Sequence, residues 1–184
     1  MVHYIILVEK RYIMDEKRMH SICFSGHRNA HLSDTVQTLM LLEMETMIKR
    51  GYRDFYAGGA PGWDTICGKA VIDFKKRRFK IRLHLILPCC FEEQTKNWSE
   101  KEKQELLEIL SNADTVEYIS EHYTKDCMKQ RNQKLVDSAG IMWCCYDKKR
   151  FRSGTGQTVR MAEKSGLRIW NFFVEAKSAP RSPN

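Results

Sequence analysis

Short apolar runs alternate with amphipathic segments along most of the chain. The apolar runs are four to eight residues long, which is the usual length of a β-strand. Several are apolar at almost every position, as is typical of strands that are buried on both faces of a parallel sheet. We predict strands at 21–24, 54–57, 81–87, 115–119, 140–147 and 167–173.

Helical periodicity fills the intervals between these runs. Asp34 and Gln37 have the spacing of a capping box, and Gly51 is a natural stop for the helix that they begin. Ser99 and Glu102 repeat the capping-box spacing further along. We predict helices over 34–50, from 62, from 99, over 124–139 and over 155–164. This alternation indicates an α/β fold, a mostly parallel sheet with helices on both faces.

The length is suited to a single domain. The chain has 184 residues, of which 42% are hydrophobic, enough for one core and too few for two. We expect one domain over 20–175, an N-terminal extension at 1–19 and a disordered tail at 176–184. The extension has a short apolar run, YIILV, but lacks the cleavage site of a signal peptide. No apolar run approaches the roughly 20 residues of a membrane helix, so we expect no membrane partner.

Cysteine usage favours a cytoplasmic location. The seven cysteines are an odd number and contain no C-x-x-C pair, whereas secreted disulfide frameworks are small and even-numbered. No cysteine or histidine pair has zinc-finger spacing, so we expect no metal site. The adjacent pairs Cys89/Cys90 and Cys144/Cys145 are interpreted as buried thiols.

The net charge of +8 at pH 7 raises two alternatives. Much of it lies in the basic runs at 75–82 and 148–152. These runs are either a solvated helix end and a loop, or a surface that attracts a phosphate-rich partner such as a nucleotide or a nucleic acid. Charge alone does not separate the two.

The loops that follow strands are the candidate binding loops, because ligands of open α/β sheets bind beyond the carboxyl ends of the strands. After the first predicted strand comes SGHRNAH. Gly26 allows the chain to turn there, and His27 and Arg28 can reach an anion. Arg28 is the best candidate for a phosphate clamp, because a guanidinium binds phosphate through a fork of donors.

After the second predicted strand comes AGGAPGWDT. Gly58 and Gly59 permit backbone conformations that side chains forbid, and Gly62 begins the next helix without a side chain in the way. Asp64 has two interpretations: it stabilises the helix dipole, or it accepts a hydrogen bond from a ribose hydroxyl. The motif is neither the dinucleotide fingerprint nor a Walker loop.

After the fifth predicted strand comes DKKRFRSGTGQT, a hydroxyl-rich and glycine-rich turn that opens a helix. Such a turn can surround a phosphate with amides and hydroxyls. The predicted phosphate-binding residues here are Ser153, Gly154, Thr155, Gly156 and Thr158. The alternative is an ordinary connecting turn of the fold.

Four further polar or aromatic residues are candidates. Arg131 and Asn132 fall on the apolar stripe of the predicted helix 124–139, where a charge is costly unless it is paired. They therefore either brace neighbouring loops or face a polar pocket. Gln94 and Trp98 follow the third predicted strand, and Trp98 either packs in the interior or stacks on a base.

Taken together, these motifs resemble the YpsA-like branch of the SLOG superfamily. The resemblance rests on FSGHR, GGAPGWD, LPC with Gln94 and Trp98, the pattern AD-VEYIS-HYT-CM-RN-LVD across 113–137, and GTGQTVRMAEKSG. It covers about residues 20–173. It implies a Rossmann-like three-layer sandwich and a nucleotide or nucleotide-derived ligand, such as NAD or ADP-ribose. A role in bacterial cell division and stress has been proposed for this branch.

Two relatives within the superfamily imply different functions. The LOG enzymes hydrolyse nucleoside monophosphates at the N-glycosidic bond, and the DprA proteins bind single-stranded DNA. The LOG motif has a catalytic glutamate shortly after its glycine–threonine, where this chain has Arg160 and Met161. Asp64 is then the weak candidate for a catalytic acid, and enzymatic activity stays open.

Three functional hypotheses follow from the residues and the resemblance. The first is a nucleotide-binding sensor or regulator, the second a nucleosidase or phosphoribohydrolase, and the third a protein that binds single-stranded nucleic acid. A homo-oligomer is also compatible with the resemblance.

Overall fold

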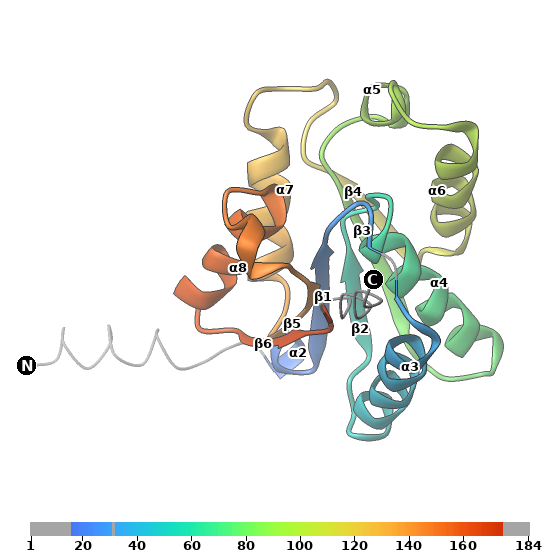
Figure 1. The fold of residues 1–184 in the computed structure, drawn as a ribbon. Helices are drawn as coiled ribbons and strands as arrows, with labels where there is room; N and C mark the ends of the chain where they lie inside the picture. The colour runs from blue at the N-terminus through green and yellow to red at the C-terminus, as the bar shows by residue number, and fades with distance from the viewer. Residues whose placement is uncertain (1–15, 31, 175–184) are drawn as a thin grey trace, which may run out of the picture.

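The computed structural model describes residues 16–30 and 32–174 as a three-layer α/β sandwich (Figure 1). Six strands form one sheet in the order β4-β3-β2-β1-β5-β6, and every neighbouring pair is parallel. The strands are β1 (Ser21–Gly26), β2 (Asp54–Ala57), β3 (Arg82–Leu87), β4 (Thr115–Tyr118), β5 (Ile141–Cys145) and β6 (Arg168–Asn171). The predicted α/β class, parallel sheet and Rossmann-like layering are confirmed.

Helices cover both faces of the sheet (Figure 1). One face carries α3 (Asp34–Lys49), α4 (Trp63–Lys76) and α6 (Glu100–Asn112), and the other carries α7 (Cys127–Asp137) and α8 (Gly154–Lys164). The shorter elements are α2 (Glu16–Met19), α5 (Phe91–Thr95) and the 3-10 turn η1 (Lys148–Arg150). No helix in the described ranges is long and apolar enough to cross a membrane.

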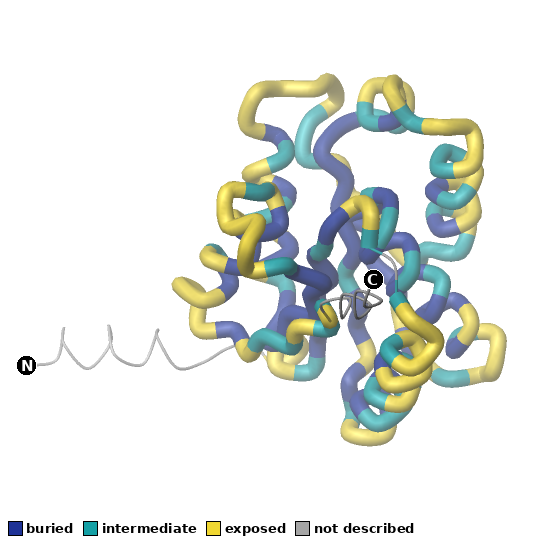
Figure 2. Tube along the Cα trace, viewed as in Figure 1, coloured by how far each residue is buried: buried dark blue, intermediate teal, exposed yellow. Residues whose placement is uncertain are grey.

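Two apolar clusters hold the layers together, one on each side of the sheet. Ile22 and Phe24 of β1 belong to the cluster under α3, α4 and α6, whereas Cys23 between them belongs to the cluster under α7 and α8. Successive strand residues point to opposite faces, so a strand between two helical layers must be apolar at every position. Figure 2 shows the resulting buried centre. This explains the continuous apolar runs of the sequence.

One predicted helix begins at a different residue, and one short helix, α5, was not predicted. α7 begins at Cys127 rather than at 124, because residues 119–126 carry the chain from the edge strand β4 to a position against β1 and β3. The helix α5 ends at Thr95, and Trp98 donates its backbone N–H to the Thr95 carbonyl at 2.9 Å. Trp98 therefore lies in the turn after α5, whereas Gln94 lies within that helix.

The end of the predicted N-terminal extension is joined to the domain. Residues 1–15 and the predicted tail at 176–184 lie outside the described residues. In α2, Arg18 Nε donates to the Ala139 carbonyl at 3.0 Å, and Ser21 Oγ donates to the Lys17 carbonyl at 2.6 Å. Residues 16–19 are thus held against the base of β1.

The turn between β2 and α4 needs glycine for a steric reason. Gly62 has a φ of +81°, and a Cβ added there would lie 2.2 Å from the carbonyl oxygen of Arg28. The neighbouring amide of Trp63 donates to the His27 carbonyl at 3.4 Å. The loop after β1 and the turn after β2 are therefore in direct backbone contact.

We predict that Gly62→Ala destabilises the protein more than Gly166→Ala does. Both glycines have positive φ, but Gly166, with φ +74°, has no atom of the described residues within 4 Å of an added Cβ. Gly166→Ala should lower the free energy of unfolding by about 1–2 kcal/mol from backbone strain alone. Gly62→Ala adds a clash with backbone, so its loss should be clearly larger. Urea unfolding of both variants measures this, and equal losses would contradict the contact between the two loops.

Candidate active site at the switch point

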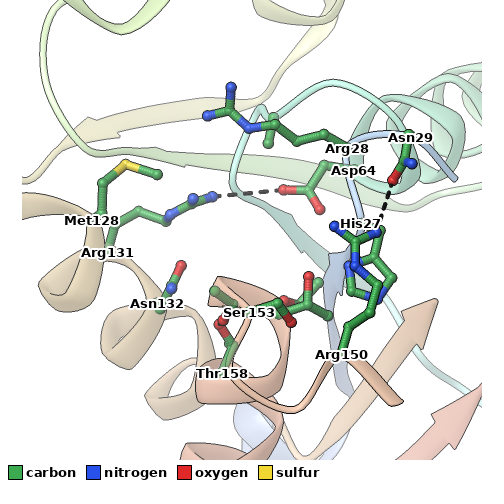
Figure 3. Close-up of a pocket in the computed structure, with 15 residues that line it drawn as sticks. His27, Arg28, Asn29, Asp64, Met128, Arg131, Asn132, Arg150, Ser153 and Thr158 are labelled. Atoms are coloured by element: carbon green, nitrogen blue, oxygen red, sulfur yellow. Dashed lines mark hydrogen bonds and ion pairs between the residues drawn. The ribbon is translucent and has the colours of Figure 1, made fainter. Parts of the chain in front are cut away.

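A polar cavity lies beyond the carboxyl ends of β1 and β5, where the order of strands reverses direction along the sequence. Such switch points are the usual ligand sites of open α/β sheets. The cavity has a volume of about 440 Å³. Figure 3 shows side chains from α4, α7, α8 and the loop after β1 arranged around it. Its lining residues are Ser25, Gly26, His27, Arg28, Asn29, Ala60, Asp64, Met128, Arg131, Asn132, Arg150, Ser153, Gly154, Thr155 and Thr158.

A buried ion pair joins two walls of the cavity. Arg131 of α7 is 6% exposed and Asp64 of α4 is 4% exposed. Arg131 Nη1 lies 3.6 Å from Asp64 Oδ2, and the same oxygen accepts the N–H of Gly58 at 3.0 Å (Figure 3). A Cβ on residue 58 would lie 1.4 Å from Arg131 Nη1. The absence of a side chain at Gly58 is thus the condition for this pair.

Burial weakens the charged form of both partners. It raises the pKa of Asp64 to about 6, against the opposing effect of Arg131 and of backbone hydrogen bonds from Ala60 and Gly58. Burial also lowers the pKa of Arg131, again opposed by Asp64. In addition, Arg131 Nε is buried and has no hydrogen-bond partner within the described part of the chain. The guanidinium therefore keeps unused capacity to bind an anion.

His27 connects the loops after β1 and β5. Its backbone N–H donates to the Cys145 carbonyl at 3.1 Å, and its Nε2 accepts the N–H of Asp147 at 3.1 Å. Burial lowers the pKa of His27, and the nearby Arg150 lowers it further. The neutral ring, with its proton on Nδ1, fits this arrangement because Nε2 must accept. Arg150 itself donates to Asn29 Oδ1 at 3.3 Å (Figure 3).

The N-terminus of α8 forms the lower wall of the cavity in Figure 3. Ser153 is the N-cap, and its Oγ accepts the N–H of Gly156 at 3.1 Å. Thr158 Oγ1 donates to the Gly154 carbonyl at 3.0 Å. The first amides of a helix lack carbonyl partners inside the helix and carry partial positive charge. Gly154 and Thr155 contribute such amides at the cavity wall.

The structure brings together most, though not all, of the predicted site residues. Those that line the cavity are Gly26, His27, Arg28, Asp64, Arg131, Asn132, Ser153, Gly154, Thr155 and Thr158. Gln94 and Trp98 line a neighbouring cavity that also contacts Arg28. Gly58, Gly59, Gly62 and Gly156 are absent from the lining of both.

The four glycines outside the lining are used by the protein itself. Gly58 donates to Asp64, and Gly59, with φ +64°, has Leu87 and Leu106 beside it. The Gly59 carbonyl accepts from Gln94 Nε2 at 3.2 Å. The Gly156 N–H is occupied by Ser153 Oγ. These glycines shape the walls of the site, and the lining of the cavity comes instead from the start of α8 and from the arginines.

Sequence reasoning did not single out Asn29, Met128 or Arg150 as site residues. Arg150 lies in the basic run 148–152, which identified a cationic surface but not which of its members faces the site. Met128 lies one turn before Arg131 and Asn132 on α7. In the described ranges, no cluster of three or more histidine, cysteine or acidic side chains could hold a metal ion.

We predict that His27 makes stability fall at acidic pH. The folded chain binds a proton at His27 less readily than the unfolded chain does. The contribution of neutral His27 to stability is therefore complete above the unfolded pKa of 6.5, and it is lost as the pH falls toward the lowered pKa of the folded chain. The free energy of unfolding of the wild type should therefore decrease relative to His27→Gln between about pH 7.5 and about pH 5. Urea unfolding across this range measures the difference, and parallel curves would contradict the assignment.

Comparison with known proteins identifies the family. The YpsA sequence model, described as the YspA SLOG family, matches residues 18–172. A structure of DNA processing protein A from Helicobacter pylori, described with a unique single-stranded DNA binding mode, has a TM-score of 0.57 at 16% identity and shares the fold. This chain covers 64% of that protein, and the alignment covers 83% of this chain. No curated protein matches the chain. Because the family match extends over most of the sequence, the chain belongs to the YspA SLOG family.

Proposed function

We propose that the switch-point cavity binds the phosphate group of a nucleotide or nucleotide-derived ligand, and that the protein acts as a sensor or regulator of that ligand. The observation that carries the proposal is Arg131. It is a buried cation whose Nε has no partner among the described residues, in a cavity that the N-terminus of α8 also lines. Guanidinium groups and helix N-termini are the two protein groups best suited to phosphate.

The charge balance of the lining supports an anionic ligand. Among the described residues, three arginines, Arg28, Arg131 and Arg150, line the cavity with a single carboxylate, Asp64. Arg28 and Arg150 are exposed at its rim, where they can attract the anion before it reaches Arg131. Asp64 is in reach of a ribose hydroxyl that enters the same cavity. Mononucleotides, NAD and ADP-ribose all combine these two chemical groups.

Hydrolysis of the ligand has weaker support. Glycosidic hydrolysis usually requires two placed carboxylates. Within the part of the lining that the structure describes, Asp64 is the single carboxylate, and its Oδ2 already contacts Arg131 and Gly58. We therefore place binding ahead of catalysis. Incubation with nucleoside monophosphates and NAD, with released base as the readout, decides between them.

We predict that Arg131→Met weakens the binding of AMP, ADP-ribose or NAD, whichever binds the wild type in calorimetry. Loss of a charge-assisted hydrogen bond should weaken binding by about 1.5–3 kcal/mol, roughly 10- to 150-fold. Arg150→Met changes an exposed side chain and therefore leaves the core intact. It should weaken binding less than Arg131→Met does.

Arg50→Met is the matched control, because Arg50 is an exposed arginine at the C-cap of α3, which leads to the opposite edge of the sheet. It should bind as the wild type does. If neither Arg131→Met nor Arg150→Met differs from Arg50→Met, or if no member of the panel binds the wild type, the proposal is wrong.

Single-stranded DNA is a second candidate, favoured by two observations. The structural neighbour is described as binding single-stranded DNA. Here, the exposed arginines Arg28, Arg150 and Arg152 lie in the loops at this edge of the sheet, and Phe151 between two of them is 56% exposed. Exposed aromatic rings beside cations are typical of surfaces that bind single strands.

If the chain binds a single strand through these three arginines, affinity for an oligothymidylate should fall steeply with salt. Each phosphate contact contributes about −0.7 to the slope of log K against log salt, so three give about −2. Arg152→Ala should reduce the slope by about 0.7, while Arg50→Met should leave it unchanged. Fluorescence anisotropy at several salt concentrations measures the slope, and a flat response would remove this candidate.

A further inference from the structure

A second cavity adjoins the first and shares Arg28 with it. It has a volume of about 600 Å³ and lies between α5 and the segment that follows β4. Its lining includes Lys96, Trp98 and Tyr123. Glu93 of α5 closes one side, since its carboxylate accepts from the backbone N–H of Tyr123 and lies 2.8 Å from His122 Nδ1. The carboxylate of Glu93 is thus engaged in holding the wall together.

Trp98 is the residue of this cavity that the fold explains least. Trp63 and Trp143 are buried in the core and Trp170 packs against it, whereas Trp98 belongs to neither apolar cluster. Its side chain is partly exposed. The packing interpretation of this tryptophan, one of the two left open by the sequence, therefore has no support in the two cores.

The position of Trp98 is nevertheless well defined. Its backbone N–H donates to the Thr95 carbonyl. The next residue, Ser99, is the N-cap of α6 and forms a complete capping box. The guanidinium of Arg28 lies 5.6 Å from the centre of the indole ring. An aromatic ring on a fixed backbone, partly open and paired with an arginine, is suited to stack on another flat ring.

We propose that the second cavity is a nucleobase subsite, in which the base of a free nucleotide stacks on Trp98 while its phosphate occupies the first cavity. The inference rests on the proposed phosphate site. Arg28 lines both cavities, so it stands at the junction between the base and the phosphate. The ligand class is then a nucleotide with an aromatic base, as distinct from a sugar phosphate without one.

The test compares ligands that differ only by the base. Calorimetry is performed with AMP, GMP, CMP, UMP and ribose 5-phosphate on the full chain. At least one nucleotide should bind more tightly than ribose 5-phosphate. Trp98→Ala should weaken that nucleotide by about 5- to 150-fold, the range of one base–aromatic stack, and leave ribose 5-phosphate unchanged. Trp98→Phe should retain part of the preference for the nucleotide over ribose 5-phosphate. Tyr118→Ala should retain all of it, because Tyr118 is an exposed aromatic residue outside both cavities.

Tryptophan fluorescence gives an independent readout. The preferred nucleotide should quench emission of the wild type, and Trp98→Phe should lose this quenching while still binding. If ribose 5-phosphate binds as tightly as every nucleotide, the base subsite is wrong while the phosphate site stands. If none of the five ligands binds, the base subsite is wrong, and the phosphate site is wrong as well when NAD and ADP-ribose also fail to bind. A third outcome is that free nucleotides bind no better than ribose 5-phosphate while the affinity for an oligothymidylate depends on Trp98. The base subsite would then bind a nucleic-acid strand, and the proposal of a free nucleotide would be wrong.

Discussion

The buried contact between Arg131 and Asp64 is the constraint on which the rest of the site depends. A charge inside a protein is costly unless it is paired, and removing one member of a buried pair typically costs about 3–5 kcal/mol. Here the pair joins α7 on one face of the sheet to α4 on the other, across the carboxyl ends of the strands. It is tolerated only because Gly58 leaves space for the guanidinium and donates its own N–H to the carboxylate.

The same contact leaves the guanidinium incompletely satisfied. Asp64 meets it through one oxygen at 3.6 Å, which is longer than a good hydrogen bond, and Nε has no partner among the described residues. A fully satisfied pair would be a structural brace and nothing more. A buried cation with remaining donor capacity beside the N-terminus of a helix is instead suited to a guest that supplies the missing negative charge. Bracing and binding are thus compatible roles of one side chain.

The glycines after β1 and β2 have a role that their composition does not by itself indicate. Glycines at the ends of strands are commonly read as making room for a ligand, and here they make room for the protein. Gly26 leaves space for the Trp63 side chain, which an added Cβ would approach to 2.3 Å, and Gly62 leaves space for the loop after β1. These contacts hold three loops in one arrangement, and the arrangement creates the cavity.

The sequence by itself determined the layers of the fold and most members of the site. Continuous apolar runs and capped amphipathic helices are local properties, so the strands and the α/β class followed from them, and parallel topology places every loop after a strand on one edge. The misplaced start of α7 shows the limit, because that boundary depends on where β4 and α7 lie in space. Only the tertiary structure decided that Gly58 faces Arg131, that Arg150 rather than its basic neighbours lines the cavity, and that Trp98 lies outside the core. Each of these facts depends on how segments distant in sequence pack together, and no local pattern of residues encodes which distant side chain occupies a given space.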